Sequence, residues 1–102
     1  MTKDPQITAA VKEILDLIKN ISPGKSVELR VPPYGAIQCV AGSNHRRGTP
    51  PNTVEMSGQT LIRLIYEPSL WITLCESGEV RASGLLSDLS NLFAQAAVKY
   101  RA

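Results

Sequence analysis

The sequence predicts an α+β fold: a single, mostly antiparallel sheet of four to five strands with helices packed on one face. Three observations lead to this prediction. Helical spacing of apolar residues marks both ends of the chain, short alternating runs mark the middle, and helices and strands are grouped rather than regularly alternating. The 102 residues fit one domain with a single modest core, so we expect residues 1–102 to form one unit.

A first helix is expected over residues 5–21. Asp4 followed by Pro5 is a typical helix start, with a capping carboxylate and then proline at the first helical position. Ser22-Pro23-Gly24 is a typical helix end. Between them, apolar residues recur every three or four positions and form one stripe: Ile7, Val11, Ile14, Ile18 and Ile21.

Three strands are expected next, over residues 26–31, 36–41 and 53–56. The first alternates between apolar and polar side chains, with Glu28 and Arg30 on its polar face. The short turn at 32–35 makes the first two strands an antiparallel hairpin. A loop over 42–52, rich in Gly, Asn and Pro, leads to the third strand.

Two short helices and a fourth strand follow. Ser57 is suited to cap the first helix, the Glu67-Pro68 pair separates it from the second, and Gly78 is suited to end the second. Residues 79–83 alternate again and are expected to form a strand.

A last helix is expected over about residues 87–101, with Ser87 or Asp88 as its cap. Its apolar residues follow the cleanest amphipathic pattern of the chain. With the helices on one face, the opposite face of the sheet would carry the polar residues of the strands, which suits contact with water. These residues are Glu28, Arg30, Gln38, Glu55 and Arg81.

The composition argues against several classes of function. A net charge of +2 and an aromatic content of 5% are too low to indicate a nucleic-acid binder. One histidine and two cysteines, Cys39 and Cys75, fall short of the about four ligands of a zinc site, and we expect no cofactor. No apolar run approaches the ~20 residues of a membrane span, and the first residues lack the apolar segment of a signal peptide. We therefore expect a cytoplasmic protein.

The segment from Val54 to Phe93 resembles the sterol carrier protein family, type two. A strand leads into a helix pair, and the strand that follows reads Gly78-Glu79-Val80-Arg81-Ala82-Ser83-Gly84, a Gly-x-hydrophobic-x-hydrophobic-x-Gly pattern. Upstream, residues 31–40 (VPPYGAIQCV) and 45–52 (HRRGTPPN) resemble actinobacterial sterol-carrier-like domains. Similar segments occur in the C-terminal domain of mycothiol-dependent maleylpyruvate isomerases. The resemblance covers about residues 25–93, and it departs at Leu85-Leu86, where the family commonly has Asp or Asn after the second glycine.

This resemblance implies a cavity between sheet and helices that holds an apolar small molecule such as a fatty acid or a sterol-like lipid. We expect no nucleic-acid partner and at most transient contact with a membrane. The same apolar side chains would also serve as an ordinary packed core, so a ligand-free interaction or accessory domain is the alternative. The residues expected to line the cavity are Leu61, Leu64, Ile65, Trp71, Leu74, Leu89, Leu92 and Phe93.

A polar end of such a ligand could be held by His45, Arg46 and Arg47, three potential cations in one loop. Arginine suits this role because its planar guanidinium can bond two oxygens of a carboxylate or phosphate. The alternative is that these arginines are solvated or pair with glutamates of the strands. An enzyme is not expected, because Cys39 lies on the apolar side of a strand, whereas a reactive thiolate needs an electropositive setting.

Overall fold

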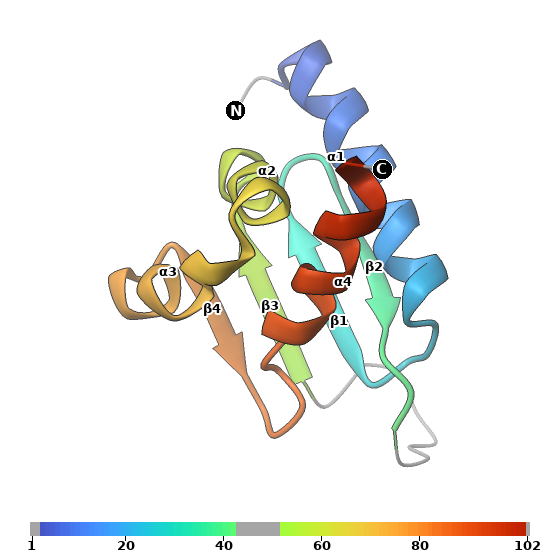
Figure 1. The fold of residues 1–102 in the computed structure, drawn as a ribbon, viewed down its shortest axis with the longest axis vertical. Helices are drawn as coiled ribbons and strands as arrows, with labels where there is room; N and C mark the ends of the chain where they lie inside the picture. The colour runs from blue at the N-terminus through green and yellow to red at the C-terminus, as the bar shows by residue number, and fades with distance from the viewer. Residues whose placement is uncertain (1–2, 43–51, 102) are drawn as a thin grey trace.

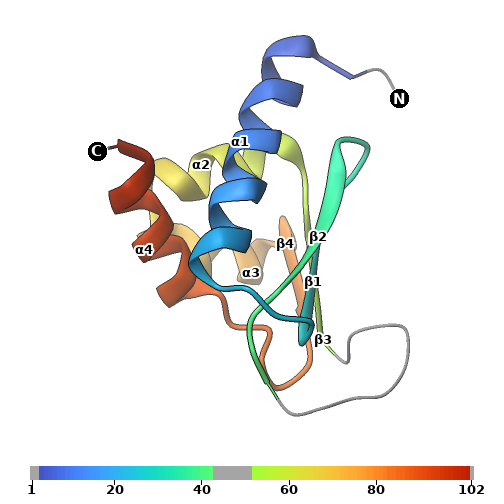
Figure 2. The same ribbon diagram turned by 90° about the vertical axis from the view of Figure 1, so that its right-hand side faces the viewer.

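The computed structural model describes residues 3–42 and 52–101, and these form two layers: a sheet, and helices that cover one of its faces (Figures 1 and 2). The predicted α+β fold is therefore confirmed. In chain order the elements are α1 (Pro5–Ile21), β1 (Val27–Val31), β2 (Gly35–Cys39), β3 (Asn52–Met56), α2 (Gly58–Tyr66), the 3-10 turn η1 (Pro68–Leu70), α3 (Trp71–Ser77), β4 (Val80–Ser83) and α4 (Ser90–Arg101).

The four strands lie in the order β2-β1-β3-β4. The pairs β1–β2 and β3–β4 are antiparallel, and β1–β3 is parallel, so the sheet is mostly antiparallel as predicted. Because the last strand in the chain stands at the edge, β4 is paired with β3 on one side only.

The register of the strands places apolar and charged residues on opposite faces of the sheet. Leu29 of β1 stands opposite Val54 of β3 and beneath the helices, and both side chains are fully buried. The next row, on the open face, places Arg30 beside Glu55 and Glu55 beside Arg81. Figure 2 shows the sheet close to edge-on, with the described helices on one side of it and none of them on the polar face.

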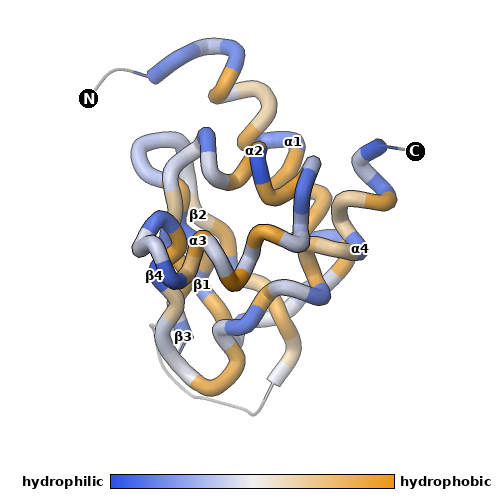
Figure 3. The backbone as a smooth tube through the Cα atoms, turned by 60° about the vertical axis from the view of Figure 1, so that its left-hand side comes forward, coloured by the Kyte–Doolittle hydropathy of each residue, from blue (hydrophilic) through white to orange (hydrophobic). Residues whose placement is uncertain are grey.

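Helix α1 begins and ends at the predicted residues. Asp4 Oδ1 accepts hydrogen bonds from the N–H groups of Gln6 (2.9 Å) and Ile7 (3.4 Å), which satisfies backbone donors that a helix start leaves free. The apolar stripe belongs to the core or packs against it. Figure 3 shows the corresponding alternation of hydrophobic and hydrophilic stretches along the helices. The buried residues of α1 are Val11, Ile14, Leu15 and Ile18.

The elements between β3 and β4 also follow the local signals. The Ser57 hydroxyl oxygen accepts a hydrogen bond from the Thr60 N–H (3.1 Å) and caps α2. Pro68 starts η1, which separates α2 from α3. Gly78 ends α3 in the left-handed conformation (φ +84°), where a residue without a side chain is favoured.

Two predicted boundaries differ from the structure by two residues or more, and several strand ends differ by one. Helix α4 begins at Ser90 instead of about residue 87, because the Asp88 carboxylate accepts from the Ser90 N–H (2.9 Å) while Ser87 closes a turn onto the Gly84 carbonyl. Strand β2 ends at Cys39 instead of residue 41, because Val40 turns into a positive φ of +67°. Its N–H bonds to the Ser22 carbonyl instead of continuing the strand (2.8 Å).

A buried asparagine fixes the end of the sheet opposite the start of α2. Asn52, at the first position of β3, is 4% exposed. Its side-chain amide donates to the Ser26 carbonyl (2.8 Å), and its side-chain oxygen accepts from the Leu86 N–H (3.0 Å). Asn52 therefore joins the start of β1 to the connection between β4 and α4. Gly84 passes so close to it that an added Cβ would lie 2.1 Å from its side-chain oxygen.

Candidate ligand-binding site

The structure brings together all eight residues that the sequence analysis assigns to the ligand. They belong to one apolar cluster between the sheet and the helices, and none is more than 8% exposed. Three come from α2, two from α3, one from the segment before α4 and two from α4: Leu61, Leu64, Ile65, Trp71, Leu74, Leu89, Leu92 and Phe93.

Two aromatic rings of this cluster pack against each other. The ring centroids of Trp71 and Phe93 are 5.9 Å apart, with the planes tilted by 32°, which is within the range of favourable aromatic pairs. The inner strand residues that complete the cluster include Leu29, Val54 and Met56. The eight side chains therefore pack as a core, and a ligand between them requires that some of them move.

Three concave regions meet on the open side of the sheet around Glu55. A groove of about 420 Å³ runs along β4, a second of about 430 Å³ lies over Pro32 and Pro33, and a pocket of about 360 Å³ lies at the start of α2. None of the eight predicted residues lines any of these three hollows. The pocket at the start of α2 reaches the core instead through Met56 and Thr60, which are 2% and 4% exposed.

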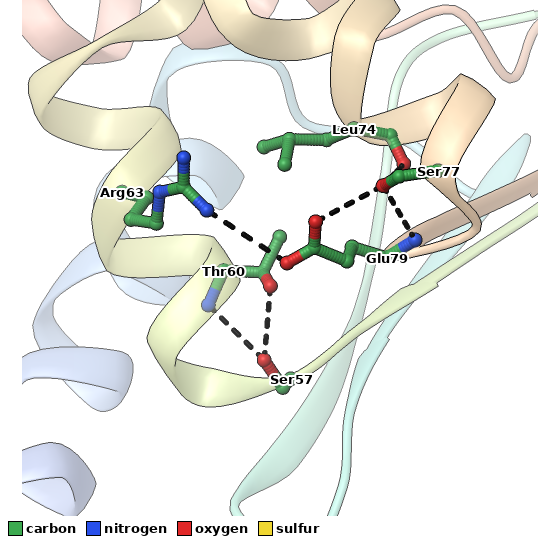
Figure 4. A network of polar contacts seen from close by, with 6 residues as sticks. All are labelled: Ser57, Thr60, Arg63, Leu74, Ser77 and Glu79. Atoms are coloured by element: carbon green, nitrogen blue, oxygen red, sulfur yellow. Dashed lines mark hydrogen bonds and ion pairs between the residues drawn. The ribbon is translucent and has the colours of Figure 1, made fainter.

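A network of polar contacts borders that pocket and joins α2 to the turn between α3 and β4 (Figure 4). Arg63 of α2 lies 3.7 Å from a carboxylate oxygen of Glu79. The Ser77 hydroxyl accepts from the Glu79 N–H (3.3 Å) and lies 3.0 Å from the other carboxylate oxygen. The hydroxyls of Ser57 and Thr60 are 3.0 Å apart and share one hydrogen bond.

The charged residues on the open face of the sheet pair with one another, both within β1 and across the strands. Arg30 Nε donates to Glu28 (2.8 Å), and Arg30 Nη1 lies 3.9 Å from Glu55. Arg81 Nη2 bonds the other oxygen of Glu55. Glu28, Glu55 and Glu79 thus each have an arginine partner among the described residues, from the same strand, a neighbouring strand and α2 respectively.

The predicted head-group residues His45, Arg46 and Arg47 lie outside the described residues. Their role remains a prediction.

The sequence analysis did not assign Ser57 and Thr60 to a pocket. The sequence there shows a helix-cap signature, which gives no indication of a pocket.

Neither cysteine is in a disulfide, and burial raises the pKa of the Cys39 thiol to about 11. Cys39 is therefore a protonated core residue at neutral pH. Within residues 3–42 and 52–101, no group of three or more His, Cys, Asp or Glu side chains is placed to hold a metal ion. No helix in the same ranges is long and apolar enough to cross a membrane.

Comparisons with known proteins agree with this fold. A family model described as a bacterial SCP ortholog matches residues 3–94. A solved structure titled UbiJ-SCP2 Ubiquinone synthesis protein has a similar fold, with a TM-score of 0.55 and 18% sequence identity over 100% of this chain and 98% of that one. At this identity the likeness shows the fold alone. No curated protein matches the sequence.

Proposed function

We propose, because this chain belongs to the family of bacterial SCP orthologs, that it binds an apolar small molecule of the fatty acyl or sterol-like class between sheet and helices. The observation that carries the proposal is the convergence of the eight apolar residues in that layer. Binding and carrying are non-enzymatic and take place in the cytoplasm.

Burial of the apolar chain drives this binding. Each CH₂ group removed from water contributes ~0.8 kcal/mol. An empty cavity of ~300 Å³ would cost roughly 7 kcal/mol at the ~24 cal/mol per Å³ measured in core truncations. That cost is comparable to the whole stability of a small domain, about 5–15 kcal/mol. The ligand-free protein therefore keeps these side chains packed, and the cavity between sheet and helices forms as the ligand enters.

The first test is native mass spectrometry of the protein purified from its own host, together with a titration with a fluorescent fatty acid. The expected results are a co-bound lipid mass and saturable binding. Leu92→Trp, at the least buried of the eight positions, fills the ligand layer and is expected to weaken binding at least tenfold. Val98→Trp is the matched control, because Val98 is 68% exposed on the same helix. A ligand-free spectrum without saturable binding refutes the proposal.

A second candidate function is a ligand-free interaction or accessory domain. The tight burial of the eight side chains favours it, since a packed core needs no ligand. In that case a specific partner copurifies, and alanine at Arg46 and Arg47 weakens the pairing. The mass spectrum that tests the first function separates the two, because a lipid mass and a protein mass cannot be confused.

A further inference from the structure

We infer that the pocket at the start of α2 is the mouth of the ligand site, and that it holds the polar end of the ligand through a hydrogen-bond-accepting group such as a carboxylate. This inference rests on the proposed function and adds the place and the chemistry of the polar end. The pocket encloses about 360 Å³ and is lined by Pro32, Glu55, Met56, Ser57, Thr60, Gly78, Glu79 and Arg81.

The pocket joins the surface to the apolar core. Its floor contains Met56, a member of the core cluster, and the buried Thr60. Its rim contains Gly78, where an added Cβ would meet no atom within 4 Å, so this side is open. A chain that enters here passes from water to the core beside Met56, while its polar end stays at the surface.

The pocket contains hydrogen-bond donors that the described residues do not use. Arg81 has five N–H donors, of which one nitrogen bonds Glu55, and its side chain is 70% exposed. The hydroxyls of Ser57 and Thr60 share one hydrogen bond between them, and the Ser57 oxygen also accepts from the Thr60 N–H. Two hydroxyls carry two protons, so one proton has no acceptor among the described residues. A group that accepts hydrogen bonds fits this set.

The two acidic residues of the pocket are already paired. Glu55 bonds Arg81 and lies near Arg30, and Glu79 lies 3.7 Å from Arg63. The two carboxylates that line the pocket are thus neutralised by arginines, of which Arg81 also lines the pocket, whereas Arg30 and Arg63 lie beside it. The Arg63–Glu79 pair is long, and both side chains are about half exposed, so it adds little stability. This pair, which joins α2 to the α3–β4 turn in Figure 4, can part to widen the mouth.

The experiment compares cis-parinaric acid, a naturally fluorescent fatty acid, with its methyl ester on the full-length protein. The wild type is expected to bind the acid about tenfold more tightly than the ester, which corresponds to about 1.4 kcal/mol. Arg81→Gln is expected to remove this preference by weakening the binding of the acid, and a circular dichroism spectrum like that of the wild type shows that the variant is folded. Thr60→Val lowers the affinity for the acid about threefold. Arg30→Gln is the matched control, because Arg30 shares Glu55 but lies outside the pocket, and it keeps the preference.

Each outcome has a defined meaning. Equal binding of acid and ester by the wild type, or a preference that survives in Arg81→Gln, overturns the inference and leaves the proposed function standing. A preference that disappears in Arg46→Gln or Arg47→Gln but not in Arg81→Gln also overturns it and assigns the polar end to the 42–52 loop. Binding of neither probe by the wild type refutes the proposed function together with the inference.

Discussion

Replacement of Asn52 by alanine is expected to destabilise the protein more than any other single change of a polar side chain at that end of the sheet. Asn52 is buried and makes two hydrogen bonds of good length, to the Ser26 carbonyl and from the Leu86 N–H. Alanine offers neither a donor nor an acceptor, so both backbone groups lose their partner.

The magnitude follows from the burial of the two partners. Ser26 is 3% exposed, so its carbonyl loses a hydrogen bond without access to water, at about 1–3 kcal/mol. Leu86 is 42% exposed, so water replaces part of the bond to its N–H, and the loss there is about 0.5–1 kcal/mol. The expected total is about 1.5–4 kcal/mol, which lowers the melting temperature of a domain of this size by roughly 6–30 °C.

Urea unfolding followed by circular dichroism measures this change as a lower midpoint at constant slope. Asn91→Ala is the matched control, because Asn91 is exposed on α4, and its free energy of unfolding is expected to stay within ~0.5 kcal/mol of the wild type. A loss below ~0.5 kcal/mol for Asn52→Ala would show that the two bonds do not stabilise the sheet.

Three further predictions concern single positions. Gly24→Ala is expected to cost more than ~1 kcal/mol in urea unfolding, because its Cβ would lie 2.2 Å from the Val40 carbonyl oxygen at a φ of +153°, whereas Gly35→Ala, with ordinary contacts, is expected to be nearly neutral. Asp4→Ala removes the cap of α1 and is expected to cost ~1 kcal/mol in the same assay; Asp4→Asn, which retains an accepting oxygen, should recover most of it. The free energy of unfolding is expected to fall between about pH 9 and 11, because the unfolded chain releases the Cys39 proton near its ordinary pKa of 9.0 while the folded protein retains it to about 11; an equal slope in Cys39→Ala would contradict this.

Local signals in the sequence predict the elements well where one signal dominates. Asp4-Pro5 and Ser22-Pro23-Gly24 define both ends of α1 because capping is decided by adjacent residues. The start of α4 was predicted too early, because Ser87 and Asp88 are both good caps and only the turn to Gly84 decides between them.

Non-local pairing limits what the sequence can predict. The parallel β1–β3 pair joins residues about 25 positions apart, and no local pattern specifies it. The eight apolar residues could be predicted as a group, since helical spacing and burial go together. The pocket at the start of α2 could not, because β3, α2 and β4 meet there only in the folded chain.

The distribution of charge gives a physical reason why access to the core should occur at that pocket. Each of the four ion pairs among described residues lies on the open face of the sheet or between α2 and the α3–β4 turn, and the apolar cluster contains no charged side chain. An amphipathic ligand needs a place where polar surface and apolar core lie next to each other, so that its polar end and its apolar chain each have a suitable environment. Around Glu55 the paired charges of the sheet stand next to Met56, the following residue of β3, which points into the core. Because side chains alternate along a strand, the charged face at Glu55 and the apolar core at Met56 are one residue apart. The unused N–H donors of Arg81 lie on the charged side.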